Sequence, residues 1–529
     1  MTRSPDPQST NSSRASVSLA DRTATGVIWG AGGALVYQLF ALFVQTALTY
    51  LLTKAQYGAY GKAFAMLGLA MLVQQVGFNE ILLRRQKHLR LWASVAFWLA
   101  LALGLCGSAI LLALARPLGL LYGDPELTTL ILLMSPTPLL RSLLVLPSAQ
   151  LIEAMRFRLH YGLMLVNGLL TSFATLAFAA YGLGAKSFVA GTLLADPIYI
   201  AIMWRLAGSE VRWGPRPSRW LPLVRDLRFV FGSNVARWIR SSVDPLIFGL
   251  FAPASAVGVY FFAQSMVGQI VRVVTLNLSG VLLPALNQIA RDPQRQTAAF
   301  LRAARVLTLI GAPLCVGLSA SGSLFVRVFL DARKWDTLPP VLGVLALGMV
   351  FRLADEPVQS LISAQGRFRL GFRVALGTGL LYIIVCSIGS IPGSPLSVAA
   401  AAALYYAVMG PLVLYQAIRV GGGRFSDALR VFWVPFLVAI AAIAPWLLLD
   451  RWMPGHGRAR DAAVLAGLIT GSAGSYLLLG RILQPAGWRE LLDQAQNRVP
   501  SRLKRLVARI GGAPLLSGFE RPRIDESAA

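Results

Sequence analysis

The sequence is poor in charged residues, in acids, in histidine and in cysteine. Only 14% of its 529 residues are charged, whereas a soluble protein carries about 25%. Three cysteines and three histidines are scattered along the chain, which argues against a disulfide framework and against a metal site. Hydrophobic residues make up 56% of the chain. This composition predicts an all-α polytopic membrane protein without a metal ion or cofactor.

The few acids leave a large positive net charge of +26, from 49 Lys and Arg against 23 Asp and Glu. In a soluble protein such a charge would suggest nucleic acid as the partner. Here the basic residues fall in short loops between apolar segments, which is typical of the cytoplasmic side of a membrane protein. We therefore expect membrane lipids, and no nucleic acid, as partners.

Apolar segments recur along the chain, each near the length of about 20 residues that a bilayer core requires. We predict fourteen spans, at 25–52, 59–83, 91–115, 127–151, 159–181, 185–207, 224–251, 256–288, 300–330, 338–363, 371–391, 396–418, 427–449 and 461–483. Basic residues gather in alternate loops, and the loops 252–255 and 392–395 on the other side carry no charge. This asymmetry predicts that both termini are cytoplasmic, so the number of spans is even. Twelve spans remain an alternative to fourteen.

The sequence repeats internally. Residues 141–170 recur at 352–381, with Arg156-Phe157-Arg158-Leu159 matching Arg367-Phe368-Arg369-Leu370. Gly58 and Tyr60 recur in the same way as Gly258 and Tyr260. The repeats predict two six-helix lobes, related by an axis along the membrane normal, with two further helices after them. The predicted parts are a disordered cytoplasmic tail (1–24), the first lobe (25–207), a cytoplasmic linker (208–223), the second lobe (224–420), an added helix pair (427–483) and a basic cytoplasmic tail (484–529).

Charged residues inside predicted spans are the candidate functional residues, because a charge near the middle of a bilayer usually faces a cavity or a partner. The cations are Arg141, Arg237, Arg240, Arg272 and Arg352, and the acids are Asp196, Asp244, Asp355 and Glu356. Spacing along a helix predicts local ion pairs between Arg240 and Asp244 and between Arg352 and Asp355. These local ion pairs are the alternative to our prediction, which is that the arginines line a cavity, with Arg141 and Arg352 facing each other across it.

A cavity lined by guanidinium groups should take an anion, because arginine binds phosphate through two parallel hydrogen bonds and keeps its charge when desolvated. We therefore predict a substrate with a phosphate or pyrophosphate headgroup. The four acids are candidates for coupling transport to an ion, since an ionised carboxylate would compete with phosphate for a nearby arginine.

The chain resembles the Wzx-like polysaccharide transporters of the multidrug/oligosaccharidyl-lipid/polysaccharide superfamily. The likeness rests on Tyr57-Gly58-Ala59-Tyr60, on Ser242-Val243-Asp244-Pro245-Leu246-Ile247-Phe248-Gly249, and on Gly366-Arg367-Phe368-Arg369. It implies two lobes that rock around a cation-lined cavity in the bacterial inner membrane, with an oligosaccharide linked to undecaprenyl pyrophosphate as cargo. It also implies a polysaccharide polymerase and glycosyltransferases as partners. Pro245, directly after the aspartate of the seventh helix, departs from the family pattern.

Three other functions are compatible with parts of the pattern. An isolated acid in the first lobe would favour a multidrug exporter of the same superfamily, and the first predicted span contains no acid. A flippase for a peptidoglycan lipid precursor would use the same cationic chemistry. A membrane polymerase or ligase would carry catalytic residues on a large outer loop, and no predicted outer loop is large enough. The sequence therefore predicts a transporter rather than an enzyme.

Overall fold

A computed structural model of the chain describes residues 32–33, 36–74, 89–154, 156–208, 220–289, 291–448 and 457–483. Within these residues every regular element is a helix. Both predicted tails, 1–24 and 484–529, and residues 209–219 of the predicted linker lie outside the described part of the chain. The protein is an all-helical, multi-pass membrane protein, as the sequence predicts.

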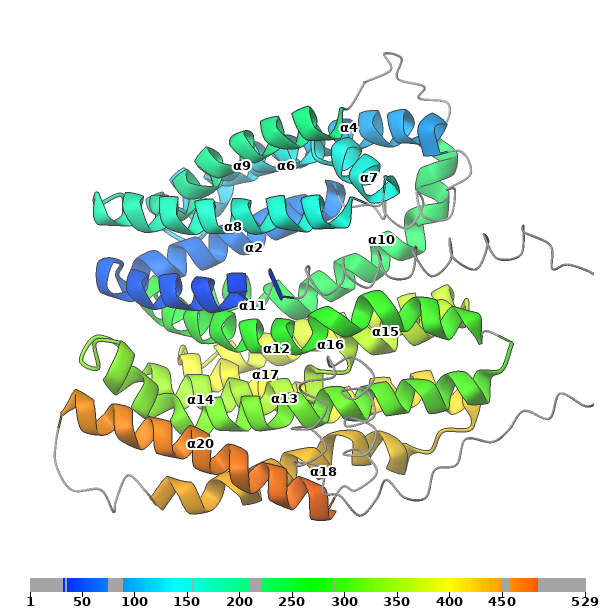
Figure 1. Cartoon of the computed structure of the whole chain (residues 1–529). Coiled ribbons are helices and arrows are strands. Elements are labelled where there is room, and N and C mark those ends of the chain that lie inside the picture. The colour runs from blue at the N-terminus through cyan, green and yellow to red at the C-terminus, as the bar shows by residue number, and fades with distance from the viewer. Residues whose placement is uncertain are drawn as a thin grey trace, which may run out of the picture.

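The helices before the linker form one half of the molecule in Figure 1. They are the helix Val36–Leu51, α2 (Lys54–Gln74), α4 (Leu89–Leu121), α5 (Pro125–Met134), α6 (Thr137–Ser142), α7 (Val145–Glu153), α8 (Phe157–Ala180) and α9 (Lys186–Ala207). In this half α4 packs on α2 and α5, and α8 packs along α9.

The helices after the linker form the other half. They are α10 (Trp220–Ser242), α11 (Asp244–Gly249), α12 (Ala254–Gln288), α13 (Pro293–Phe329), α14 (Leu338–Met349), η3 (Val350–Arg352), α15 (Asp355–Ala364), α16 (Phe368–Ser390), α17 (Pro395–Ile418), η4 (Arg419–Gly421), α18 (Phe425–Ile443), η5 (Ala444–Leu448) and α20 (Arg458–Leu483). Here α14 packs on α13 and α17, and the last pair, α18 and α20, packs against α13.

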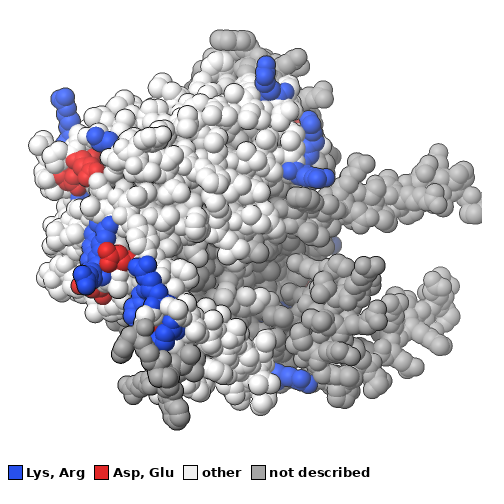
Figure 2. Space-filling model, turned by 60° about the vertical axis from the view of Figure 1, so that its left-hand side comes forward, with Lys and Arg blue, Asp and Glu red and all other residues white. Residues whose placement is uncertain are grey.

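Eleven helical stretches of the described chain are long and apolar enough to cross a membrane. The other three predicted spans, at 25–52, 59–83 and 224–251, coincide with the shorter apolar helix Val36–Leu51, with α2 and with α10–α11. In Figure 2 the charged side chains lie at two ends of the molecule, and a broad belt of uncharged residues separates them. Large apolar side chains such as Leu404 and Leu478 are about two-thirds exposed, at 67% and 66%. Such a surface is suited to lipid.

Several helices begin with the same local device, a polar residue followed by proline. Asp124 accepts a hydrogen bond from the backbone N–H of Leu127, and Asp292 accepts one from the N–H of Arg295. Ser394 accepts a hydrogen bond from the N–H of Leu396. In each case the proline occupies the first helical position, where its missing N–H removes no intrahelical bond. These caps set the first residues of α5, α13 and α17, at 125, 293 and 395. The corresponding predicted spans begin at 127, 300 and 396.

The sequence repeat is also a structural repeat. The span from Pro125 to Glu153 is broken into α5, α6 and α7, and its counterpart from Leu338 to Ala364 is broken into α14, η3 and α15. The residues that precede the next helix match in backbone geometry: Arg156 has φ −85° and ψ 46°, and Arg367 has φ −90° and ψ 46°. Equivalent segments of the two halves therefore share their breaks as well as their sequence.

Candidate functional site

A cavity of about 710 Å³ lies between the two halves. On one side it is lined by the helix Val36–Leu51 and by α2, α8 and α9. On the other side it is lined by α10, by α12, and by the broken span that contains η3 and α15. The cavity therefore lies between the two halves of the chain, and its lining includes the equivalent helices α2 and α12.

Four of the five predicted arginines line this cavity, and all four come from the second half of the chain: Arg237, Arg240, Arg272 and Arg352. Among the described lining residues, the acid is Asp355. Four guanidinium groups against one carboxylate make the cavity strongly positive. Such a site attracts anions and repels organic cations and metal ions.

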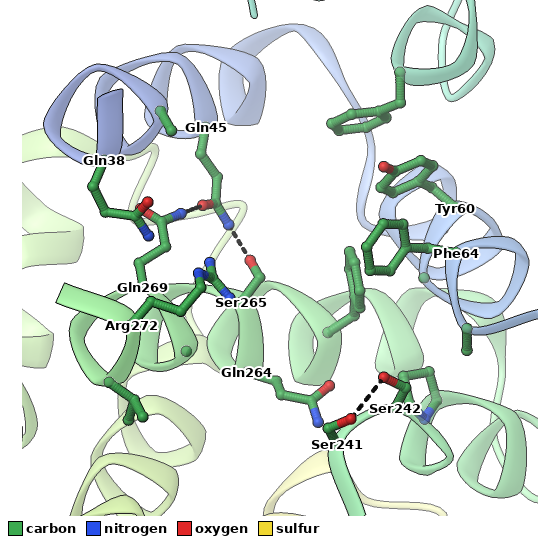
Figure 3. A pocket seen from close by; sticks show the side chains of 18 of the residues that line it. Gln38, Gln45, Tyr60, Phe64, Ser241, Ser242, Gln264, Ser265, Gln269 and Arg272 are labelled. Carbon is green, nitrogen blue, oxygen red and sulfur yellow. Dashed lines mark hydrogen bonds between the residues drawn. The ribbon is translucent and has the colours of Figure 1, made fainter. Parts of the chain in front are cut away.

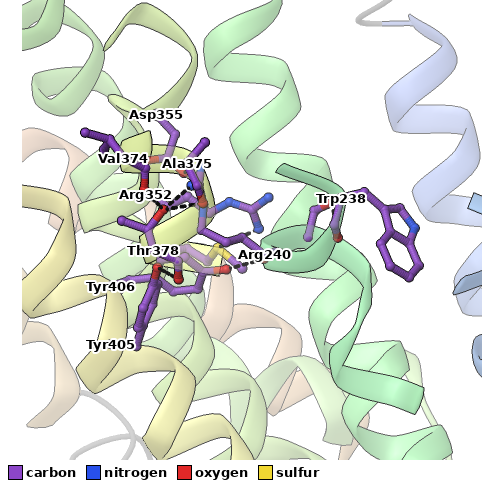
Figure 4. Close-up of polar contacts among 11 residues, drawn as sticks. Trp238, Arg240, Arg352, Asp355, Val374, Ala375, Thr378, Tyr405 and Tyr406 are labelled. Atoms are coloured by element: carbon purple, nitrogen blue, oxygen red, sulfur yellow. Dashed lines mark hydrogen bonds and ion pairs between the residues drawn. The ribbon is translucent and has the colours of Figure 1, made fainter. Parts of the chain in front are cut away.

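Arg240 is held in place by three helices. Its guanidinium donates to Thr378 Oγ1 of α16 at 2.7 Å and lies 3.6 Å from Asp355 Oδ2 of α15. Its backbone carbonyl accepts a hydrogen bond of 2.6 Å from the Tyr406 hydroxyl of α17. Figure 4 shows these groups converging on Arg240, with Arg352 beside them. The side chain is thus positioned by its neighbours before any ligand enters.

Arg352 lies over the Tyr406 ring, with its guanidinium carbon 5.4 Å from the ring centroid. An aromatic face stabilises a cation without neutralising it. Arg237 and Arg272 have even fewer contacts than Arg352, since neither makes a hydrogen bond or an ion pair with any residue of the described chain. Among the described residues, Arg237 and Arg272 are thus the two cavity arginines whose positive charge no hydrogen bond or ion pair engages.

The two predicted local ion pairs are wrong. Arg240 pairs with Asp355 rather than with Asp244, and Arg352 contacts Tyr406 rather than making an ion pair with Asp355. The spacing rule assumes one continuous helix, and both helices are interrupted between the partners. The regular helix is interrupted at Val243 between α10 and α11, and again between η3 and α15, so each acid starts a new helix.

Asp244 is buried away from the cavity, at 1% exposure. Its Oδ2 accepts three hydrogen bonds of 2.7 Å, from the hydroxyls of Tyr260 and Tyr382 and from the side-chain amide of Gln264. Its Oδ1 has no partner. Asp244 thus ties α11 to α12 and α16. The predicted coupling role of this acid stays a prediction, as does that of Glu356, whose side chain lies outside the described part of the chain.

Arg141 differs from the prediction, because its side chain is not among those that line the cavity. Its Nε lies 3.2 Å from Oδ2 of Asp196 on α9, and Asp196 also accepts a hydrogen bond of 3.3 Å from Asn167 on α8. Arg141, predicted to bind substrate, and Asp196, predicted as a coupling acid, therefore form an ion pair with each other. Their contact joins α6 to α9 and cannot be deduced from spacing along the chain.

The cavity is closed at the end where α2 and α12 begin. Gly58 and Gly258 lie against each other, and a Cβ atom at Gly58 would fall 1.9 Å from the carbonyl oxygen of Ala254. A Cβ at Gly258 would fall 1.8 Å from the carbonyl oxygen of Lys54. Only glycine permits such an approach, because any side chain would collide with backbone. The halves are therefore sealed together at this crossing.

A loop of the second half, residues 330–337, strengthens the same closure. Lys334 Nζ donates to the carbonyl oxygens of Thr49 at 2.7 Å and Leu52 at 2.6 Å, at the end of the helix Val36–Leu51. Lys54 Nζ lies 3.1 Å from Asp336 Oδ1, and its hydrogen bond holds the pKa of that carboxyl below its usual value. We call Lys334, Lys54 and Asp336 the latch.

The sequence alone missed the opposite wall of the cavity, which carries aromatic and amide side chains instead of charges. Tyr60 and Phe64 of α2 belong to it, together with Gln45 of the helix Val36–Leu51. Figure 3 shows the two aromatic residues on one side of the cavity and the amide group on the other. The motif Tyr57-Gly58-Ala59-Tyr60 was the available signal for this wall, since Tyr60 lies in it.

Comparison with known proteins places the chain in a family. The model of the family described as "Polysaccharide biosynthesis protein" matches residues 47–340, more than half of the chain, so the chain belongs to that family. The lipopolysaccharide biosynthesis protein WzxC of Escherichia coli (strain K12) is 22% identical over 81% of this chain and 87% of its own length. The succinoglycan biosynthesis transport protein ExoT of Rhizobium meliloti (strain 1021) is 24% identical over 86% of this chain and 91% of its own.

Solved structures agree on the fold. The lipid II flippase MurJ in an inward closed conformation matches 90% of this chain and 100% of its own, with a TM-score of 0.61 and 15% identity. A multidrug transporter of the MATE family in an inward-facing conformation matches 76% of this chain and 99% of its own, with a TM-score of 0.55 and 13% identity. The fold is therefore that of the superfamily that the sequence motifs resemble.

Proposed function

We propose that the protein is a flippase that carries a lipid-linked oligosaccharide across the bacterial inner membrane for polysaccharide biosynthesis. The observation that carries the proposal is the cavity between the two halves, with four arginines and one acid among its described lining residues. Membership of the polysaccharide biosynthesis family, and relatives named for lipopolysaccharide and succinoglycan biosynthesis, support the same cargo. The cargo's headgroup is a pyrophosphate, carried by undecaprenol.

The geometry suits this cargo step by step. Arg237 and Arg272 have no partner in the described chain and are free to meet the pyrophosphate as it enters. Arg240 and Arg352 are preorganised by Thr378 and Tyr406, so little side-chain entropy is lost on binding. The lipid tail stays in the membrane while the headgroup crosses within the protein. The closed end at Gly58 and Gly258 then opens as the halves rock, and the headgroup leaves on the other side.

The predicted orientation, with both termini in the cytoplasm, is part of the proposal. It places the closed end in the periplasm and makes the present structure a state that loads from the cytoplasm. Glycosyltransferases that build the cargo and a polymerase that consumes it are the expected partners on the two sides. The protein moves its cargo without chemical change and is not an enzyme in this proposal.

A flipping assay tests the function. Purified protein is placed in vesicles with a fluorescent polyprenyl pyrophosphate that bears a sugar, and an impermeant quencher reports which leaflet holds the label. We expect wild-type protein to expose inner-leaflet lipid to the quencher. Arg352→Ala should slow this at least tenfold, because a desolvated phosphate loses one charged partner. Arg352→Lys should recover part of the rate, since lysine restores the charge without the two-pronged geometry.

Arg419→Ala is the matched control, because Arg419 is exposed at the end of α17 and does not line the cavity. Its rate should equal that of wild type. Full flipping by the double variant Arg237→Ala with Arg352→Ala would show that the cavity arginines do not carry the headgroup. Failure of the wild-type protein to move any lipid-linked sugar would overturn the function itself.

A further inference from the structure

The wall of the cavity that faces the arginines carries no charged side chain among its described residues. The helix Val36–Leu51 and α2, α8 and α9 contribute aromatic rings, amides, hydroxyls and small apolar groups. The four cavity arginines all lie on the opposite wall, beside neutral groups of α12 such as Phe261 and Gln269. A pyrophosphate accounts for the arginines only, and the aromatic and amide groups are suited to a ligand group of a different kind.

Aromatic rings form a continuous group on this wall. Tyr60 stacks on Phe188, with ring centroids 4.0 Å apart and planes 16° from parallel. Phe64 lies 5.8 Å from Tyr60, and Phe261 from α12 meets both rings, at 5.9 Å and 6.2 Å. Phe64 is 47% exposed and projects into the cavity, as Figure 3 shows. It offers a flat apolar surface to whatever the cavity holds.

Side-chain amides form a second group a short way along the cavity. Gln269 donates from its Nε2 to Oε1 of Gln45, and Gln45 donates from its Nε2 to the hydroxyl of Ser265. Gln269 is only 8% exposed, yet its Oε1 has no hydrogen-bond partner. A buried acceptor without a partner is costly unless a ligand satisfies it. Figure 3 shows Gln38 and Arg272 beside this group, so it meets the cationic wall.

Flat rings and neutral hydrogen-bonding groups together match a sugar. The C–H face of a pyranose packs against an aromatic ring, while its hydroxyls exchange hydrogen bonds with amides. A phosphate would be drawn instead to the guanidinium groups, and a polyprenyl chain would leave the amide acceptor unsatisfied.

We propose that the cavity is divided into two subsites, with the pyrophosphate on the arginines and the first sugars of the cargo on two neutral groups: the rings of Tyr60 and Phe64, and the amides of Gln45 and, across the cavity on α12, Gln269. This inference rests on the proposed function, and it adds that the protein recognises the carbohydrate itself. Phe64 stacks on a sugar ring, and Gln269 Oε1 accepts a hydrogen bond from a sugar hydroxyl. The boundary between the subsites lies where Arg272 adjoins Gln269.

Equilibrium binding to the full-length protein in nanodiscs separates the subsites. The probes are a short polyprenyl pyrophosphate without a sugar, and the same lipid bearing glucose, galactose or N-acetylglucosamine. We expect wild-type protein to bind at least one glycosylated probe more tightly than the sugar-free lipid. Phe64→Leu and Gln269→Leu should each weaken the preferred glycosylated probe roughly 2- to 10-fold, and should leave the Kd of the sugar-free lipid unchanged.

Phe43→Leu is the matched control, because Phe43 is a phenylalanine of the helix Val36–Leu51 that is 64% exposed but does not line the cavity. Its Kd values should equal those of wild type. Equal wild-type affinity for all four probes would overturn the sugar subsite. So would an equal loss of glycosylated and sugar-free lipid in Phe64→Leu, which would assign the wall to the lipid chain. Only the absence of binding by wild-type protein to every probe would count against the proposed function as well.

Discussion

Two arginines at equivalent positions of the repeat have opposite surroundings. Arg141 meets the carboxylate of Asp196, whereas the residue in the same register of the second half is Ala407. Arg352 therefore has no acid there and lies over the Tyr406 ring instead. In the first half the arginine forms an ion pair that joins α6 to α9. In the second half the equivalent arginine lines the cavity. The sequence repeat thus places an arginine at the same position in both halves, but the residues around each arginine determine whether it forms an ion pair or lines the cavity.

This difference predicts a structural role for Arg141. Arg141→Met should leave Asp196, which is 3% exposed, without its partner, and should cost about 1–3 kcal/mol of stability. The figure is below that of a fully buried pair because the Arg141 side chain is 46% exposed. Adding Asp196→Asn removes the unpaired charge, so the double variant should regain most of the lost stability in thermal unfolding and should flip lipid. A stable double variant that cannot transport would mean that Arg141 contacts the cargo.

At the scale of elements, interrupted helices separate what the sequence could predict from what it could not. Hydropathy summed over about 20 residues gives the spans, because the whole segment must match the bilayer. The breaks at Val243 and after Arg352 interrupt the regular helix without changing that sum. A signal for them was present, since Pro245 and Pro357 each follow an acid at the first turn of a helix. The Arg141–Asp196 contact had no such signal, because it joins separate helices.

The latch is the element whose loss should favour opening. Lys334→Met removes two hydrogen bonds to the carbonyls of Thr49 and Leu52, and should shift the balance toward the open state by about 1–2 kcal/mol, roughly tenfold. The measurement is the yield of a thiol-specific cross-link between cysteines placed at Tyr50 and Phe329, which meet at the same end and lie outside the latch, in a Cys106→Ser background. The yield should fall in Lys334→Met.

Arg333→Met is the control for this experiment, because Arg333 is in the same loop and is exposed. It donates a hydrogen bond to Asp331 through its backbone N–H, which the substitution keeps. The cross-link yield of Arg333→Met should match that of the parent protein. An unchanged yield in Lys334→Met would mean that the glycine crossing alone holds this end shut.

At the scale of the whole molecule, the sequence predicts two ends that differ in charge, and the structure shows close packing of the two halves at one of them. The sealed end includes Gly58, Gly258 and the latch, while the loops predicted to be cytoplasmic lie at the other end. A rocking transporter exposes one end at a time, so which end faces the cytoplasm decides which step the structure represents. The distribution of Lys and Arg predicts that the sealed end is periplasmic.

Thiol labelling in intact cells tests this orientation. Ser255 is exposed at the start of α12, at the sealed end, and Ser426 is exposed at the start of α18, at the opposite end. With Cys106 replaced by Ser, an impermeant maleimide should label Ser255→Cys from outside and should label Ser426→Cys only after the cells are lysed. The reverse pattern would invert the topology and would make the present state one that loads from the periplasm.

The crossing of α2 and α12 also bears on the origin of the chain. Gly58 approaches the carbonyl of Ala254 and Gly258 approaches that of Lys54, so each glycine meets the repeat equivalent of the other's partner. Such a reciprocal contact is the kind that two identical subunits form around a two-fold axis. An ancestral half-length protein with one such glycine could therefore have paired with its own copy before gene duplication and fusion joined the two. In the present chain the two halves differ at the cavity, since the second contributes the four arginines and the first contributes Tyr60 and Phe64.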